Sequence, residues 1–176
     1  MGLLHYPSLP VQNLQPGCSA RMPVHSDFGS LTLLFQDNVG GLEVADLSTG
    51  DARSSVTFEE TGRFKKVKPI AGTAVMNVGY LLMRWSNGRW KNTIHRVVDP
   101  SFSLEKRHTI NDSLKVQGSS GSEEAMTQER FSIPLFAHPD HTTMIEALPG
   151  CWSDENPKKW KPFNAGDYLQ RKKKAI

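Results

Sequence analysis

Two histidines and one aspartate in this chain could hold a metal ion. His25 and Asp27 are separated by a single residue, and His95 follows much later in the sequence. On an extended strand, side chains two residues apart project from the same face, so His25 and Asp27 can reach one ion. Two imidazoles and one carboxylate suit a ferrous ion that keeps its opposite positions open for a bidentate co-substrate and for dioxygen. These three residues are therefore the candidate metal ligands.

An arginine and a serine with the same two-residue spacing could bind an acid. Arg130 and Ser132 belong to the segment RFSIPLF, and a strand there would place a guanidinium fork and a hydroxyl side by side. A carboxylate is the group that this pair would recognise. Taken alone, each motif has an ordinary alternative, because a His-x-Asp sequence recurs by chance and an arginine at a strand edge is often a solvated charge.

Short β-rich segments recur between turn signals, which predicts an all-β sandwich or barrel. Asn87-Gly88 predicts a type I′ hairpin that delivers His95, because both residues tolerate a positive φ angle. Residues 165–174 predict a short helix, and the polar stretches 48–62 and 106–129 are expected to be loops or insertions. The expected strands are residues 3–6, 21–27, 32–36, 42–46, 64–67, 74–77, 81–85, 93–98 and 130–136.

Composition is typical of a globular protein. The chain has 176 residues, of which 38% are hydrophobic, so a single domain that covers residues 1–176 is expected. No apolar run approaches the length of a membrane span and the start lacks a signal-peptide pattern, which predicts a cytoplasmic protein with reduced cysteines at Cys18 and Cys151. The net charge of +3 comes largely from lysines and arginines near the C-terminus. Without interleaved aromatic residues, this run favours a solvated face over a nucleic-acid site.

Three blocks of sequence carry a family resemblance: HSDFGSLTLLFQDNVGGLEV from His25, NVGYLLMRWSNGRWKNTIHRVV from Asn77, and RFSIPLF from Arg130. In order and content they resemble the iron- and 2-oxoglutarate-dependent dioxygenases of the isopenicillin N synthase-like family. The resemblance runs from LLHYP near the start to AGDYLQRK near the end. It implies a double-stranded β-helix, or jelly roll, that is mainly β with short flanking helices.

The resemblance also implies the contents of the site. His25, Asp27 and His95 match the family's iron ligands, Arg130 and Ser132 match its carboxylate clamp, and Tyr6 matches a tyrosine that hydrogen-bonds the co-substrate. The implied cofactors are Fe(II) and 2-oxoglutarate, with ascorbate as a further reductant. The implied reaction couples decarboxylation of 2-oxoglutarate to hydroxylation, desaturation or ring closure of a small organic substrate, for example a specialised metabolite, with dioxygen.

Three departures from the family pattern leave two other functions open. Tyr80 stands where most members have an acidic residue, His95 and Arg130 are 35 positions apart, and the chain is expected to correspond to the C-terminal half of family members. A non-catalytic remnant or interaction module is one alternative, because a missing N-terminal region would leave apolar faces uncovered. The other is an iron oxidase of the same fold that does not use 2-oxoglutarate. Neither alternative would produce succinate.

Overall fold

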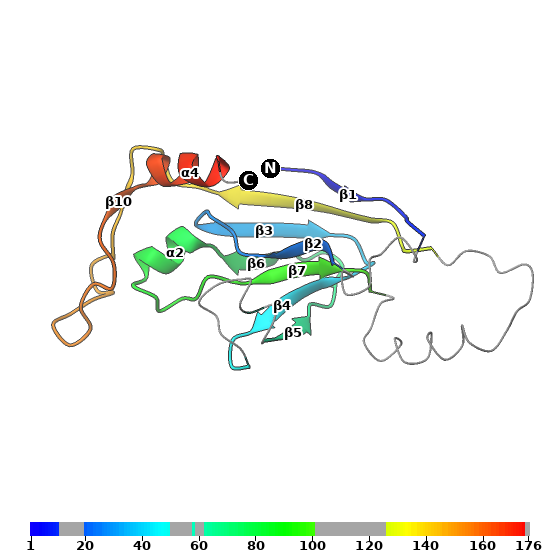
Figure 1. The fold of residues 1–176 in the computed structure, drawn as a ribbon, viewed down its shortest axis with the longest axis horizontal. Coiled ribbons are helices and arrows are strands. Elements are labelled where there is room, and N and C mark those ends of the chain that lie inside the picture. The colour runs from blue at the N-terminus through cyan, green and yellow to red at the C-terminus, as the bar shows by residue number, and fades with distance from the viewer. Residues whose placement is uncertain (11–19, 50–57, 59–61, 101–125, 175–176) are drawn as a thin grey trace, which may run out of the picture.

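The fold is built mainly from short strands. A computed structural model of the protein describes residues 1–10, 20–49, 58, 62–100 and 126–174 (Figure 1). In chain order the elements are β1 (Leu4–Tyr6), β2 (Ala20–His25), β3 (Leu31–Gln36), β4 (Leu42–Asp46), β5 (Arg63–Lys66), β6 (Val75–Val78), α2 (Tyr80–Trp85), β7 (His95–Val98), β8 (Arg130–Ala137), β9 (Met144–Ile145), β10 (Phe163–Asn164) and α4 (Ala165–Lys173).

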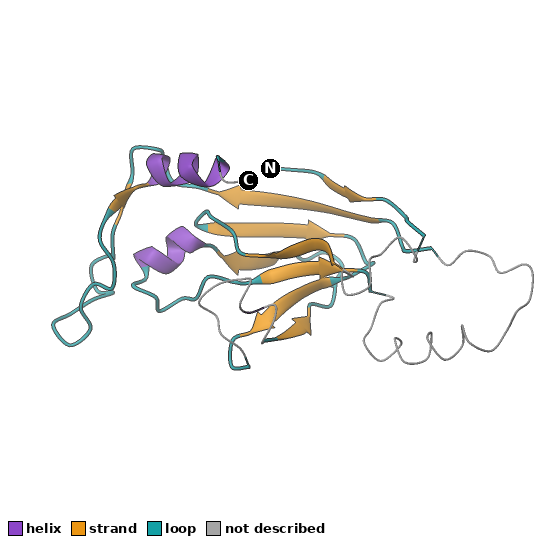
Figure 2. Cartoon of the chain, in the orientation of Figure 1, coloured by secondary structure: helices purple, strands orange, loops and turns teal. Residues whose placement is uncertain are grey.

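Two antiparallel sheets of four strands form the body of the molecule. One has the order β1-β8-β3-β6 and the other β2-β7-β4-β5, while β9 and β10 form a separate two-stranded ribbon. Tyr6 of the first sheet packs with Leu42 and Val97 of the second, and these three side chains are buried between the sheets. This mainly β architecture confirms the jelly-roll expectation, with helices α2 and α4 beside the strands (Figure 2).

The two faces of β8 differ sharply. Its burial alternates, so that Arg130, Ser132 and Pro134 are buried while the residues between them are exposed. The exposed side chains Phe131 and Ile133 are large and apolar, and Phe35, the partner of Ile133 on β3, is exposed as well. The sheet β1-β8-β3-β6 therefore carries polar groups on its inner side and an apolar strip on its outer side.

The prediction of a strand at residues 81–85 is wrong. These residues lie in helix α2, which begins after Gly79, and the Met83 amide donates to the Gly79 carbonyl oxygen. A short apolar run fits a buried helical turn as well as a strand, and Leu-Leu-Met-Arg consists of good helix formers. Leu81 is fully buried against the α4 region.

The expected hairpin before His95 is consequently wrong too, although the turn itself forms. Asn87 and Gly88 have φ angles of 52° and 77°, as the turn prediction required. They follow a helix instead of a strand, and the Gly88 amide donates to the Met83 carbonyl oxygen. The Asn-Gly pair therefore ends α2, and His95 is carried to the site by the irregular segment that follows it.

Further expectations concern the C-terminal helix, the polar stretches and the cysteines. The predicted C-terminal helix is α4, and Asn164 caps it by accepting a hydrogen bond from the Asp167 amide at 3.1 Å. Most of the polar stretches 48–62 and 106–129, and Cys18, lie outside the described residues, whereas Cys151 is a free cysteine. Among the helices of the described ranges, none has the length and apolar character needed to cross a membrane.

Candidate active site

Two histidines face each other across neighbouring strands. His25 ends β2 and His95 begins β7, the two are paired in the sheet register, and their ring centroids are 4.2 Å apart. Their Nδ1 atoms lie 2.7 Å from the Pro23 carbonyl oxygen and 3.0 Å from the Thr93 carbonyl oxygen, respectively. Because a carbonyl oxygen can only accept, both Nδ1 atoms carry a proton, and in the neutral imidazole the lone pair is then on Nε2. This is the tautomer that a metal ligand requires.

Burial favours the neutral form of His95. Loss of hydration lowers the pKa of His95 below its usual value, and the neighbouring His25 lowers it further. Hydrogen bonding to the Thr93 carbonyl oxygen and the proximity of Asp27 act in the opposite direction but are weaker. The imidazole is therefore kept neutral, as metal binding through nitrogen demands.

The carboxylate of Asp27 is held from two strands. Strand β2 ends at His25, so Asp27 lies just beyond it and not on the longer strand predicted from the sequence. Its Oδ2 accepts hydrogen bonds from Thr32 Oγ1 at 2.5 Å and from Asn77 Nδ2 at 2.8 Å. Thr32 and Asn77 are cross-strand partners on β3 and β6. The backbone is also fixed, because the Tyr80 amide donates to the Asp27 carbonyl oxygen.

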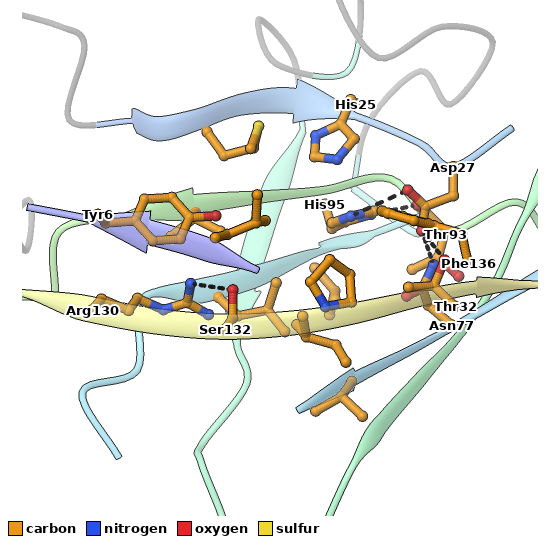
Figure 3. Close-up of a pocket in the computed structure, with 18 residues that line it drawn as sticks. Tyr6, His25, Asp27, Thr32, Asn77, Thr93, His95, Arg130, Ser132 and Phe136 are labelled. Carbon is orange, nitrogen blue, oxygen red and sulfur yellow. Dashed lines mark hydrogen bonds and ion pairs between the residues drawn. The ribbon is translucent and has the colours of Figure 1, made fainter. Parts of the chain in front are cut away.

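The three predicted metal ligands converge. One ligand atom from each of His25, Asp27 and His95 lies within 4.8 Å of the others. Asp27 Oδ1, which the Thr32 and Asn77 bonds leave free, is 4.0 Å from His95 Nε2. Figure 3 shows these side chains together at one end of a cavity. Two imidazoles and an oriented carboxylate form a donor set that fits a ferrous ion.

The other end of the cavity is built around a buried arginine. Arg130 is opposite Tyr6 in the pairing of β1 with β8, and its guanidinium carbon lies 4.9 Å from the centre of the Tyr6 ring. Arg130 donates from Nε to the Gly40 carbonyl oxygen at 2.7 Å, from Nη1 to Ser132 Oγ at 3.2 Å and from Nη2 to Gln36 Oε1 at 3.1 Å. All three acceptors are neutral.

Arg130 keeps hydrogen-bond donor capacity and a positive charge that no described carboxylate pairs with. A guanidinium has five N–H groups; these three bonds use three of them and the Tyr6 side chain is a further hydrogen-bond partner, so donor capacity remains for a ligand. Arg130 is 2% exposed, and within the described ranges no carboxylate lies within 4.0 Å of its nitrogens. Burial lowers its pKa, while Tyr6 and Asp37 oppose that shift. An isolated buried charge is unfavourable, so this end of the cavity is suited to an anionic ligand.

One cavity joins the two ends. Its empty volume is about 630 Å³ including the mouth, and all six predicted site residues line it: Tyr6, His25, Asp27, His95, Arg130 and Ser132. In Figure 3 Tyr6, Arg130 and Ser132 lie together at the end away from the histidines. The walls between the ends are mainly apolar and include Leu4, Met22, Leu34, Val44, Val75 and Val97.

Sequence reasoning missed the residues that hold these groups in place. Thr32, Leu34 and Gln36 lie at every second position of β3 and face inward, so Thr32 and Gln36 are four positions apart. A polar residue at each end of an otherwise apolar face was the signal in LTLLFQ that could have identified both. Tyr80, the departure from the family pattern, stacks on Tyr168 with ring centroids 5.0 Å apart, and its hydroxyl accepts from Arg84 at 2.8 Å. It therefore serves packing outside the cavity.

Comparison with known proteins identifies the family. Residues 2–114, a span that contains all three candidate metal ligands, match the profile of the 2OG-Fe(II) oxygenase superfamily. The chain belongs to this superfamily.

Individual relatives agree with that placement. The 2-oxoglutarate-dependent dioxygenase lolO2 of Epichloe uncinata is 36% identical over 169 residues, which cover 93% of this chain and 39% of the relative. The 2-oxoglutarate-Fe(II) type oxidoreductase hxnY of Emericella nidulans is 33% identical over 175 residues, 97% of this chain and 38% of the relative. The chain thus spans about two fifths of the length of these curated relatives.

A solved structure reproduces the fold. A full-length Neurospora crassa protein, crystallised in complex with alpha-KG and 5-formyluracil, superposes with a TM-score of 0.74 and 35% sequence identity. The match covers 99% of this chain and 46% of that protein. The double-stranded β-helix of the superfamily is therefore the fold of this chain, and Fe(II) and 2-oxoglutarate are the cofactors that family membership implies.

Proposed function

We propose that this chain forms the catalytic barrel of an Fe(II)- and 2-oxoglutarate-dependent dioxygenase. It would couple oxidative decarboxylation of 2-oxoglutarate, to succinate and carbon dioxide, with oxidation of a small organic substrate. The observation that carries this proposal is that one cavity joins a His-Asp-His donor set to a buried arginine that has no carboxylate partner among the described residues. A 2-oxo dicarboxylic acid could bind the metal through its 2-oxo acid group and the arginine through its second carboxylate.

His25, Asp27 and His95 would hold Fe(II), which supplies the redox chemistry with dioxygen when bound. Asp27 would contribute the one negative charge among the three, and its hydrogen bonds from Thr32 and Asn77 occupy Oδ2 and leave Oδ1 free for the ion. The lone pairs of both Nε2 atoms are available because each Nδ1 proton is committed to a backbone carbonyl oxygen.

Arg130 and Ser132 would bind the distal carboxylate of 2-oxoglutarate. The remaining donor capacity of Arg130 and the Ser132 hydroxyl would supply charge-assisted hydrogen bonds, and the Tyr6 ring packs against the guanidinium and limits its movement. The apolar walls between the two ends exclude water and leave room for a small organic substrate near the metal. The Neurospora crassa neighbour, which holds alpha-KG together with 5-formyluracil, supports a small-molecule substrate.

Succinate formation tests the proposal directly. Oxygen uptake and succinate should both appear when Fe(II) and 2-oxoglutarate are added, with ascorbate as reductant, and both should stop when either is withheld. Succinate made without a substrate would still support the co-substrate site. Oxygen uptake without succinate would point to an iron oxidase, and absence of both would point to a non-catalytic module.

Arg130→Lys tests the carboxylate end. Lysine keeps the charge but loses the planar fork, so 2-oxoglutarate binding should weaken by roughly 1.5–3 kcal/mol while Fe(II) binding is retained. Isothermal titration under anaerobic conditions measures both affinities. Arg63→Lys, on the exposed surface of β5, is the matched control and should change neither. Unaltered 2-oxoglutarate binding in the Arg130 variant would remove this residue from the site.

A further inference from the structure

Gln36 lies behind the arginine of the cavity. It is the last residue of β3 and is paired with Ser132 in the register of β3 with β8, so the two side chains share the inner face of the sheet. Its Oε1 accepts the hydrogen bond from Arg130 Nη2 at 3.1 Å. Its Nε2 is buried and, within the described part of the chain, has no hydrogen-bond partner. The amide orientation is nevertheless fixed, because the opposite orientation would set two donors against each other.

We propose that Gln36 is a positioning residue that sets both the direction and the net charge of the anion-binding end. Its carbonyl holds Nη2 in place, and its neutrality leaves the positive charge of Arg130 for the ligand. The residue would therefore determine the selectivity for a 2-oxo acid with a second carboxylate over one without. This inference rests on the proposed function and extends it to a residue outside the cavity lining.

The neutrality of every acceptor around Arg130 supports this role. Asp37 is the carboxylate whose charge acts on Arg130, but its oxygens are committed elsewhere. Asp37 Oδ1 accepts from the Val39 amide and Oδ2 accepts from the Phe131 amide. A carboxylate at position 36 would instead lie at hydrogen-bond distance from Nη2, in a buried setting where opposite charges attract strongly. It would satisfy the guanidinium internally and compete with the ligand.

Gln36→Glu is the deciding variant, because it changes one amide to a carboxylate at nearly constant shape. Dissociation constants for 2-oxoglutarate and for pyruvate, a 2-oxo acid without a second carboxylate, should be measured by anaerobic titration of the Fe(II)-loaded chain. We expect 2-oxoglutarate binding to weaken about tenfold or more. Binding of pyruvate and of Fe(II) should stay within about twofold of the unsubstituted chain, since neither contacts Arg130.

Two further variants separate charge from damage to the fold. Gln36→Met removes the acceptor without adding charge, so it should weaken 2-oxoglutarate binding less than Gln36→Glu and again spare pyruvate. Gln170→Glu makes the same charge change on the exposed side of α4 and should alter nothing, because exposed charges contribute little.

The outcomes are distinct. A Gln36→Glu chain that binds 2-oxoglutarate as tightly as the unsubstituted chain would overturn the inference, as would equal weakening for 2-oxoglutarate and pyruvate. If the glutamate variant does not fold, Gln36→Met decides by the same selectivity ratio. Failure of the unsubstituted chain to bind 2-oxoglutarate at all would overturn the proposed function as well, so the two failures are told apart before any variant is made.

Discussion

The two ends of the cavity are assembled in different ways. At the end proposed to hold the metal (the metal end: His25, Asp27 and His95), the candidate ligands come from the last residue of β2, the segment after it and the first residue of β7. The opposite end, proposed to bind the distal carboxylate of 2-oxoglutarate, is called the carboxylate end. Its residues are direct neighbours across β1, β8 and β3: Tyr6, Arg130, Ser132 and Gln36. The first arrangement depends on where strands stop, whereas the second follows from sheet register alone.

The two ends of the cavity also differ in the sign of the ligand charge that each would bind. The metal end combines one carboxylate with two imidazoles, and burial favours the neutral form of His95, so this end suits a cation. The carboxylate end holds a guanidinium whose described acceptors are all neutral, so this end suits an anion. Because each end is incomplete by itself, substitutions should affect the binding of one ligand more than that of the other.

The largest effect should come from Asp27→Ala. This change removes the only anionic candidate ligand, so Fe(II) binding should be lost, as measured by anaerobic titration. Asp27→Asn repeats the test with less change in packing, and thermal unfolding followed by circular dichroism checks that either variant is folded. His138→Ala is the control, because His138 does not belong to the converging group and should leave Fe(II) binding intact. The reverse result would place the metal elsewhere.

Thr32→Val should have an intermediate effect confined to the metal end. Valine keeps the shape of threonine but removes the hydrogen bond to Asp27 Oδ2. Loss of a group that orients a metal ligand typically weakens metal affinity by about 10- to 100-fold, and we expect a change in that range. The exposed Thr142→Val provides the control. If 2-oxoglutarate binding to the metal-free chain weakened as much as Fe(II) binding does, the separation of the two ends would be disproved.

The smallest effect on the site should come from Ile133→Thr. Ile133 lies between Ser132 and Pro134 but faces outward and is exposed. Both cofactor affinities should therefore be unchanged, and self-association detected by light scattering should decrease because the outer apolar strip is interrupted. A marked loss of 2-oxoglutarate binding would show that the faces of β8 are not independent.

The carboxylate end was accessible from the sequence because strand periodicity is a strong local rule. The two-residue spacing of Arg130 and Ser132 placed them on one face, and the structure has them so. Their supports were not accessible, because the pairing of β3 with β8 that brings Gln36 beside Ser132 depends on register between distant segments.

The metal end was predicted in its residues but not in its geometry. His25 and Asp27 were expected on one continuous strand, but β2 ends at His25 and hydrogen bonds from Thr32 and Asn77 orient the aspartate. The path to His95 was also misjudged, since the run after Gly79 forms α2. Residues in such short apolar runs adopt the structure that tertiary packing selects, and here the buried contact of Leu81 decides for a helix.

Strand β3 supports both ends of the cavity at once. Thr32 orients Asp27 and Gln36 orients Arg130, and these two residues are four positions apart on the same strand. An extended backbone rises by about 3.4 Å per residue, so their Cα atoms are separated by about 14 Å along the strand. The spacing of the two binding groups is therefore fixed by the backbone itself. Oxaloacetate, one carbon shorter than 2-oxoglutarate, and 2-oxoadipate, one carbon longer, should both bind less tightly than 2-oxoglutarate for this reason of length.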